Sequence, residues 1–423
     1  MRRKSSSKCL RFSIYSTILP LNKDPKNTMV PGRLRTHFSR VYHTTPLLPR
    51  SYGDHTTKSP FQRSLSLSDD ALKDHFFKPK TTTSRNGLTL PVVAIAGATG
   101  AVGIEMRKCL EQLKFPFHSL RVFAHPSEEG DLVQCNGIDY PCEVVDEHSF
   151  DNVDIALFSA GDVFSKEWAP KAAKAGCIVV DNSPEFRMDP DVPLVVPEVN
   201  AHAVQKHNNI LANPNCTTIL MNVPVFPLHQ AFGVERAVVS TYQAASGAGL
   251  DAMQELEQQA RDWANGDPLS QDIFGRQYIW NLFNHNSPQY QDNGYNAEEW
   301  KMVEETPKIF EGPFKVAVTC VRVPVLRAHC ESINLQFKRK VTLEEVYDVL
   351  NKSPGIRIVD DRVNNKHPEP LDASGEFDIL VGRIRYDQSL EEGYGIDMFI
   401  AGDQLLKGAA LNAVQIAQLL LEK

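Results

Sequence analysis

The chain has 423 residues, of which 42% are hydrophobic and 23% are charged, and this indicates a globular protein of about two domains. Its net charge of -7 gives no reason to expect a nucleic acid or an anionic membrane as a partner, and no apolar run is long enough to cross a bilayer. The eight cysteines are scattered without a CxxC pair, which argues against a zinc site or a dense disulfide framework and fits a reducing compartment.

The first stretch of the chain is basic and poor in acids. Residues 1–63 hold many Arg, Lys, Ser and Thr but only two acids, Asp24 and Asp54. Apolar periodicity is poor here and no long apolar core follows the basic start, which disfavours a secretory signal. This composition is typical of an organelle transit peptide, and a simple disordered tail is the alternative. We expect residues 1–89 to form a transit-peptide-like leader and linker, disordered or absent from the mature protein.

A turn of small residues follows the first predicted strand, at residues 91–96. It has the sequence Gly97-Ala98-Thr99-Gly100-Ala101-Val102-Gly103 and leads into a helical pattern at 104–113. Small residues let the backbone approach a pyrophosphate, and the start of the helix supplies N–H donors. A strand, a G-x-x-G-x-x-G turn and a helix therefore predict a dinucleotide site at residues 97–103, although such a turn also forms without a ligand.

Strands and helices alternate in the segment that follows. Apolar patterns predict strands at 120–124, 153–158 and 177–180, and a helix at 163–175. This alternation indicates a parallel sheet covered by helices, with ligands at the carboxyl ends of the strands. We expect residues 90–213 to form a Rossmann-type NAD(P)-binding domain of the α/β class.

The loop after the second predicted strand bears on the choice between NADP and NAD. It reads His125-Pro126-Ser127-Glu128-Glu129-Gly130, without the Arg that a 2′-phosphate prefers. Ser127 is able to donate to either cofactor, so we include it among the cofactor-binding residues. Glu128 and Glu129 would repel a phosphate if they point inward, and two solvated loop acids are the alternative. The sequence of this loop therefore does not exclude NAD as the cofactor.

Cys216 follows Asn213-Pro214-Asn215, and a helical apolar pattern begins directly after it. Unpaired N–H groups and the helix dipole stabilise an anion at the first turn of a helix, so we expect the thiolate to be favoured there. A thiolate in this position is a candidate nucleophile. The alternative is a buried structural cysteine, which is the usual state of a free thiol.

The segment after Cys216 predicts a strand at 234–241, a turn that contains Gln243, and a helix at 250–265. At this turn the amide of Gln243 is suited to orient a carbonyl or a carboxylate, although a loop Gln is more often solvated. Residues 266–295 are rich in Asn, Gln and Asp, which predicts a long surface loop.

A helix at 297–305 and two strands, at 315–325 and 329–338, are predicted next. Arg322 alternates with apolar neighbours on the first strand, so its charge needs a partner, which a substrate carboxylate would supply. His329 begins the second strand, where a packed or solvated role is the alternative to that of a catalytic base.

The remaining patterns complete an α+β second domain with a mixed or antiparallel sheet. Thr342 followed by Glu345 predicts the N-terminus of a helix that ends at residue 351. The other predicted elements are strands near 356–361, 379–386 and 395–400, and an amphipathic C-terminal helix at 405–421.

Eight segments in order resemble the aspartate-semialdehyde dehydrogenase family, and together they are far more specific than any one of them. The resemblance runs from about residue 91 to 423 and leaves the leader outside. The matching segments are residues 97–103, 181–189, 196–200, 213–218, 242–249, 299–301, 321–329 and 406–410.

The resemblance implies a role for each matching residue. The catalytic group comprises the nucleophile Cys216, the acid/base His329 and Gln243, which orients the acyl-enzyme. The substrate group comprises Arg187, Asn215 and Lys301, which bind phosphate, and Arg322 and Glu299, which hold the amino-acid head. The cofactor group comprises Gly97, Thr99, Gly100, Ala101, Val102, Gly103, Ser246, Gly247 and Asn412.

The resemblance also implies an activity and an assembly. The expected reaction reduces L-aspartyl 4-phosphate to L-aspartate 4-semialdehyde with NADPH, through a thioester on Cys216, on the route to lysine, threonine and methionine. Residues 214–404 are expected to form a catalytic and dimerisation domain, with 405–423 packing back on the first domain. A homodimer or homotetramer is implied, and the leader suggests a plastid, with a mitochondrion as the alternative.

Three other functions are alternatives to this one. In N-acetyl-γ-glutamyl-phosphate reductase the cysteine typically lies in Gly-Cys-Tyr-Pro-Thr, whereas this chain has Asn215-Cys216-Thr217-Thr218. An acyl-CoA reductase on the same scaffold is disfavoured by Arg187 and Lys301, which suit a phosphate leaving group. A non-catalytic NAD(P)-binding paralogue is disfavoured because Cys216 and His329 are both present.

Overall fold

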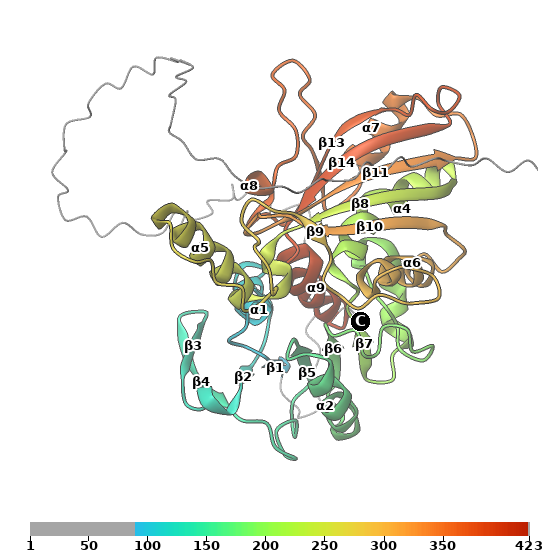
Figure 1. Ribbon diagram of the computed structural model, residues 1–423. Coiled ribbons are helices and arrows are strands. Elements are labelled where there is room, and N and C mark those ends of the chain that lie inside the picture. The colour runs from blue at the N-terminus through green and yellow to red at the C-terminus, as the bar shows by residue number, and fades with distance from the viewer. Residues whose placement is uncertain (1–88, 422–423) are drawn as a thin grey trace, which may run out of the picture. The chain divides into compact units, whose positions relative to one another are not determined.

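The computed structural model describes residues 89–421, shown in Figure 1. The predicted leader and linker, except for its last residue, therefore lies outside the described residues. The described chain contains two seven-stranded sheets. None of the described helices is both long and apolar enough to span a membrane.

The first sheet has the strand order β3-β4-β2-β1-β5-β6-β7 and is parallel except for β3, which runs antiparallel to β4. Its strands are β1 (Val92–Ala96), β2 (Ser119–Phe123), β3 (Leu132–Cys135), β4 (Ile138–Glu143), β5 (Ile155–Phe158), β6 (Ile178–Asp181) and β7 (Ile210–Ala212). The predicted α/β domain is thereby confirmed. The boundary at residues 213 and 214 falls between β7 and the next helix and stays a prediction.

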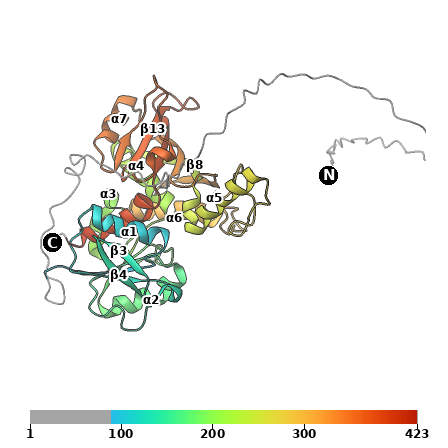
Figure 2. The same ribbon diagram turned by 90° about the vertical axis from the view of Figure 1, so that its left-hand side faces the viewer.

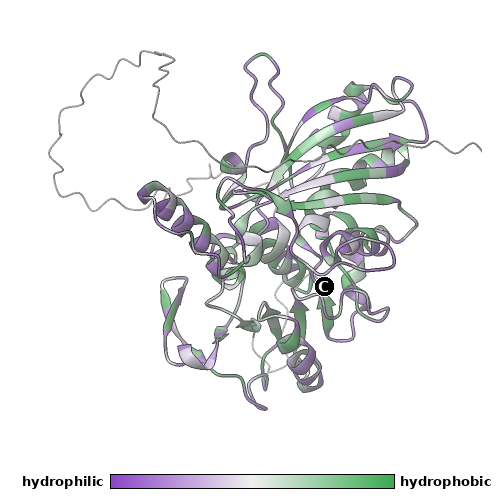
Figure 3. Ribbon diagram, viewed as in Figure 1, coloured by the Kyte–Doolittle hydropathy of each residue, from purple (hydrophilic) through white to green (hydrophobic). Residues whose placement is uncertain are grey.

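Helices cover both faces of this sheet because its inner strands are apolar on both sides. Val93 and Ile95 of β1 pack with α1 (Ala101–Gln112), and Ala94 and Ala96 pack with α2 (Asp162–Ala175). In Figure 3 the strands β5 and β6 are coloured green, because their residues are hydrophobic, whereas α2 also carries purple, hydrophilic residues. The short helices of this half are η1 (Pro126–Glu128), α3 (Pro197–Asn200) and η2 (Ala201–Lys206).

The second sheet is mixed, as predicted, with the order β12-β13-β14-β11-β8-β10-β9. Its strands are β8 (Val234–Gln243), β9 (Phe283–Asn284), β10 (Val316–Arg322), β11 (His329–Phe337), β12 (Ile356–Ile358), β13 (Ile379–Tyr386) and β14 (Gly395–Gly402). The core beneath one face is shared with α4 (Cys216–Phe232), α6 (Ala297–Ile309) and α7 (Leu343–Asn351). The remaining short helices are η3 (Ala245–Ala248) and α8 (Pro370–Ala373).

The segment at 266–295 is not simply a surface loop. Phe274, Tyr278 and Phe283 form a buried aromatic cluster against α5 (Leu250–Asn265). These three aromatic residues could not be recognised as buried from the sequence, because the segment is mostly polar and an irregular segment shows no apolar period. The segment also carries β9 and reaches the candidate site through residues 285–287.

The C-terminal segment is buried rather than amphipathic. It begins as the π-helix η4 (Leu406–Ala410) and continues as α9 (Leu411–Leu419). Figures 1 and 2 show this red segment beside α1 of the first domain, and η4 also contacts α4. In this structure η4 and α9 both contact α1. An amphipathic pattern is lacking because both sides of the segment are covered.

Candidate active site

Cys216 is the first residue of α4, as the sequence predicted. The side-chain oxygen of Asn215 caps this helix by accepting from the N–H groups of Thr217, at 3.1 Å, and Thr218, at 3.4 Å. β7 ends at Ala212, so the chain leaves the first sheet and enters α4 within a few residues. The thiol therefore lies where the first sheet's carboxyl edge meets the second domain.

The thiol of Cys216 is neutral in this environment. Part of the residue remains accessible, but dense packing raises the pKa of its thiol to about 12, and the Glu298 carboxylate raises it further. Arg322, Lys301 and Arg187 act in the opposite direction without overcoming burial. The thiolate expected from the sequence is therefore not favoured in the free protein, because burial and the Glu298 carboxylate outweigh the three nearby cations.

Three further candidate residues end or begin adjacent strands of the second sheet. Gln243 ends β8, Arg322 ends β10 in register with it, and His329 begins β11 on the other side of β8. All three are buried. Gly247 packs over this row, since a Cβ there would lie 2.9 Å from both the Arg322 guanidinium and the His329 ring. The sheet thus brings together residues that are far apart in sequence.

His329 is a neutral imidazole with a defined tautomer. Its Nδ1 accepts from the N–H of Ala244 at 3.0 Å, so the ring proton belongs on Nε2. Nε2 is buried and has no hydrogen-bond partner among residues 89–421. Burial, and then the Arg322 guanidinium, lower the pKa of this imidazole well below its ordinary value. A buried donor without a partner is suited to meet an oxygen of a bound substrate.

Glu298, on the first turn of α6, links the site together and was missed in the sequence. Its carboxylate accepts from Asn215 Nδ2 at 3.0 Å, Gln243 Nε2 at 3.2 Å and Lys301 Nζ at 2.9 Å. Burial opposes its charge, but Lys301, His285 and the Asn215 hydrogen bond outweigh burial and hold its pKa well below the usual range. It is therefore a buried anion at the centre of the predicted residues.

Glu299 was predicted to hold the amino-acid head of the substrate together with Arg322, but its carboxylate accepts from backbone N–H groups in this structure. One of its carboxylate oxygens accepts from the N–H of Asn296 at 2.9 Å and completes a capping box at the start of α6. The other accepts from the N–H of Cys320 at 3.0 Å. Both oxygens hold backbone groups, so Glu299 fixes α6 to β10. The neighbouring acid Glu298 takes the position in the site.

The predicted phosphate-binding residues Arg187 and Lys301 lie on either side of Asn215. Glu305 connects one side, since it accepts from Arg187 Nη1 at 3.1 Å and from the N–H of Asn215 at 2.7 Å. Glu298 connects the other side, through Asn215 and Lys301. Both cations also act on the Cys216 thiol. Arg187 and Lys301 therefore both lie near the start of α4, each paired with one of these two carboxylates.

Arg322 is a buried guanidinium without a carboxylate partner among the described residues. Its Nη1 donates to the carbonyl of Ala244 at 3.1 Å, and its Nε donates to Asn286 Oδ1 at 3.4 Å. Among the described residues no acid forms an ion pair with it, although it is only 3% exposed. A buried guanidinium in this state fits the carboxylate of a small substrate.

His285 is a second group that the sequence did not reveal. Its N–H donates to the carbonyl of Cys320 at 2.9 Å, and burial lowers the pKa of its imidazole to about 4. Glu298, Arg322 and Lys301 all act on this pKa, so His285 borders the same site. It lies in the polar segment predicted to be a surface loop, which offered no signal for it.

The turn between β1 and α1 has the geometry that a pyrophosphate requires. A Cβ at Gly97 would collide with the carbonyl of Ser159, and one at Gly103 with the carbonyl of Gly97. Gly100 precedes α1, whose N-terminus no described side chain caps. The predicted contacts Ala101 and Val102 are the first two residues of that helix. Close backbone and open N–H donors fit a dinucleotide.

The other predicted cofactor contacts differ in their surroundings. Ser246 and Gly247 lie in η3 directly after Gln243, and the hydroxyl of Ser246 accepts from Gln404. The side chain of Asn412 donates to the carbonyl of Val195 and to Asn213 Oδ1, and it accepts from Lys407 Nζ. These contacts are all within the protein, and the cofactor contact predicted for Asn412 stays a prediction.

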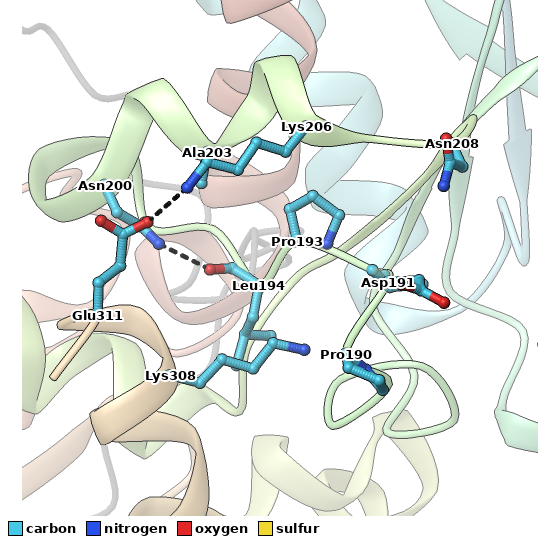
Figure 4. Close-up of a pocket in the computed structure, with 11 residues that line it drawn as sticks. Pro190, Asp191, Pro193, Leu194, Asn200, Ala203, Lys206, Asn208, Lys308 and Glu311 are labelled. Carbon is cyan, nitrogen blue, oxygen red and sulfur yellow. Dashed lines mark hydrogen bonds and ion pairs between the residues drawn. The ribbon is translucent and has the colours of Figure 1, made fainter. Parts of the chain in front are cut away.

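A separate pocket of about 280 Å³ lies beside the end of α6, as Figure 4 shows. Its lysines are engaged by the protein: Lys206 pairs with Glu311 at 3.1 Å, and Lys308 donates to the carbonyls of Arg187 and Asp189. Cys216 does not line this pocket. The candidate active site is therefore the group around Glu298.

Two family models match the chain, "Semialdehyde dehydrogenase, NAD binding domain" at residues 92–207 and "Semialdehyde dehydrogenase, dimerisation domain" at residues 225–407. With the fold and the site, they define an NAD(P)-binding oxidoreductase of the semialdehyde dehydrogenase class. Aspartate-semialdehyde dehydrogenase from Synechocystis is 49% identical over 332 residues, which cover 78% of this chain and 97% of that protein. The chain belongs to the aspartate-semialdehyde dehydrogenase family, as the sequence predicted.

Other relatives agree with this assignment. Aspartate-semialdehyde dehydrogenase from Aquifex aeolicus is 45% identical over 336 residues and is covered to 98% of its length. A crystal structure of aspartate semialdehyde dehydrogenase II from Vibrio cholerae, complexed with ASA, is 42% identical with a TM-score of 0.76. The match covers 79% of this chain and 99% of that one. The rival reductases are correspondingly disfavoured.

Proposed function

We propose that this protein reduces L-aspartyl 4-phosphate to L-aspartate 4-semialdehyde through a thioester on Cys216. The observation that carries the proposal is the anion Glu298, which joins Asn215, Gln243 and Lys301 beside the thiol. In this reaction the sulfur attacks the acyl carbon, the bond from that carbon to the phosphate oxygen breaks, and the thiol proton leaves with the phosphate as hydrogen phosphate. Arg187 and Lys301 stabilise the departing phosphate by their charge.

The amino-acid head of the substrate carries one group of each charge. The buried guanidinium of Arg322 is suited to its carboxylate, and the carboxylate of Glu298 is suited to its ammonium. His329 is set to donate a proton from Nε2 to the oxygen at the reacting carbon. Gln243 holds the acyl group, because Thr241 donates to its Oε1 at 3.0 Å and fixes its amide.

A nicotinamide dinucleotide, when bound, supplies the hydride for the second half of the reaction. Residues 97–103 would hold its pyrophosphate at the start of α1. The resemblance implies NADP as this dinucleotide, and NAD is the alternative because the loop after β2 lacks an Arg. Ser127 is the predicted contact in that loop, and in this structure its hydroxyl forms a hydrogen bond with His125 Nδ1 at 2.8 Å.

Activity in the oxidative direction tests the proposal. Aspartate semialdehyde and phosphate are supplied with NADP or NAD, and formation of the reduced cofactor is followed by absorbance. We expect turnover by the wild type and a loss of at least about a thousandfold in Cys216→Ala. Turnover that survives in Cys216→Ala would refute the thioester, and activity only with the glutamyl analogue would refute the substrate.

We also propose that the chain forms a homodimer, or a homotetramer, through the outer face of its second sheet. The matched dimerisation domain supports oligomerisation. On that face the ring of Tyr242 lies 6.1 Å from the ring of Phe399, and Tyr242 is 38% exposed. Sedimentation should show that Tyr242→Lys weakens assembly, whereas Val363→Lys, at a fully exposed loop position, leaves assembly unchanged.

We propose a plastid location on the basis of residues 1–89 alone. Their acid-poor, Arg- and Ser-rich composition supports an organelle transit peptide. A fusion of residues 1–89 to a fluorescent protein should enter plastids in plant cells, whereas the fluorescent protein alone should not. Accumulation in mitochondria would favour the alternative location, and a diffuse distribution would contradict a transit peptide.

A further inference from the structure

The loop after β2 carries only negative charge. Residues 124–131 contain the acids Glu128, Glu129 and Asp131 and no Lys or Arg. β2 pairs with β1 in parallel up to Ala96 and Phe123, so this loop and the glycine turn leave the same edge of adjacent strands. In dinucleotide-binding folds this edge receives the ribose that carries the 2′-hydroxyl or the 2′-phosphate.

Glu128 is fixed against the glycine turn rather than solvated. Its Oε2 accepts from Thr99 Oγ1 at 3.0 Å, across 29 positions of sequence, and from the N–H of His125 at 3.3 Å. The latter contact belongs to a capping box that closes η1. Glu128 is half-buried, whereas the neighbouring Glu129 is exposed. Among residues 89–421, Oε1 of Glu128 makes no hydrogen bond.

The chemistry of this position differs for the two cofactors. A carboxylate is an acceptor only, so it accepts a hydrogen bond from the 2′-hydroxyl of NAD and repels the 2′-phosphate of NADP. On α1, Nη1 of Arg107 donates to the carbonyl of Gln134. We propose that Glu128, held by Thr99, makes this chain prefer NAD over NADP. The inference rests on the proposed dinucleotide site and reverses the cofactor that the family resemblance implies.

Binding of each cofactor to the full chain, measured by titration calorimetry without substrate, tests the inference. We expect the wild type to bind NAD at least about tenfold more tightly than NADP. In Glu128→Gln the affinity for NADP should rise about tenfold and that for NAD should fall a few-fold. The matched control is Glu129→Gln, whose exposed side chain should leave the ratio of the two affinities within about twofold.

The role of Thr99 is tested separately, because it acts by positioning Glu128. Thr99→Val should reduce the preference for NAD several-fold, and Thr99→Ser, which keeps the hydroxyl, should retain it. Equal or tighter binding of NADP by the wild type would overturn the inference. It would also be overturned if Glu128→Gln and Glu129→Gln changed the ratio alike, or if the wild type bound neither cofactor. Binding is read without turnover, so a failed semialdehyde assay leaves this test intact.

Discussion

At the residue scale, two adjacent acids on α6 have different roles that a sequence pattern separates only in part. Glu299 lies three positions after Asn296, and this Asn-x-x-Glu spacing is a capping signature. The signature was present in the sequence and predicts the structural role of Glu299. Nothing in the local pattern predicts that Glu298 meets Asn215 and Gln243, because those contacts span 83 and 55 positions.

The two acids should therefore respond differently to the same substitution. Glu298→Gln removes the charge that faces Lys301, so kcat/KM for aspartate semialdehyde should fall about a hundredfold. Glu299→Gln weakens a helix cap and should cost about 1 kcal/mol of unfolding free energy with kcat/KM nearly unchanged. Steady-state kinetics and urea unfolding of both variants check this, and equal kinetic losses would contradict the assignment.

The raised pKa of Cys216 makes its alkylation strongly pH-dependent. Below a thiol pKa of about 12, the thiolate fraction rises tenfold for each pH unit, so labelling by iodoacetamide should accelerate steadily with pH. Mass spectrometry of the peptide that contains Cys216 measures the rate. Glu298→Gln removes a negative neighbour, which lowers the thiol pKa and should speed labelling at a given pH. A wild-type rate that already levels off near neutral pH would contradict the neutral thiol.

At the element scale, the sequence predicted long periodic elements well and short or buried ones poorly. The helix at 250–265 and the capped helix after Thr342 have the predicted bounds, because amphipathic period and caps are local signals. The hairpin of β3 and β4 was missed, although Asn136 and Gly137 at its turn have the positive φ angles typical of a two-residue hairpin. The π-helix η4 has no sequence signal of its own.

The contact between η4 and α4 gives a prediction at this scale. Gly408 of η4 packs on Cys216, and a Cβ there would lie 2.9 Å from Cys216 Cβ and 3.3 Å from its Cα. Gly408→Ala should therefore displace the thiol and lower kcat at least about tenfold, since small displacements of a reacting group are costly. A Cβ at Gly312 would approach only the carbonyl oxygen of Phe310, at 3.9 Å, so Gly312→Ala should leave kcat unchanged. Equal kcat in both variants would contradict this packing.

At the scale of the whole molecule, the ion pairs between distant segments of the chain are the part that the sequence could not predict. Arg327, before β11, pairs with Glu105 of α1 at 3.0 Å and with Asp403 after β14 at 2.7 Å. Lys407 is likewise buried against Glu198, 209 positions away. Each partner is an ordinary charged residue in its own segment, so only the folded arrangement identifies the pair. The family resemblance supplied the site residues that local patterns left ambiguous.

The Arg327 network predicts a pH-dependent stability. Burial raises the pKa of Asp403, and Arg327 counteracts that rise. Arg327→Leu leaves Asp403 as a buried anion without its partner, which should cost about 3–5 kcal/mol of unfolding free energy at neutral pH. The pKa of Asp403 should then rise further above its unfolded value. A raised folded-state pKa favours folding at low pH, so the variant should recover part of the loss as pH falls.

Urea unfolding of the wild type and Arg327→Leu at about pH 7.5 and about pH 5.5 measures this difference. The gap between the two proteins should narrow at the lower pH, because the native variant takes up a proton at Asp403 before the unfolded chain does. Lys352→Ala is the matched control, since its ion pair with Asp348 is solvent-exposed and should contribute at most about 1 kcal/mol at either pH. A gap that stays constant or widens at pH 5.5 would show that Arg327 contributes through packing rather than through the charge of Asp403.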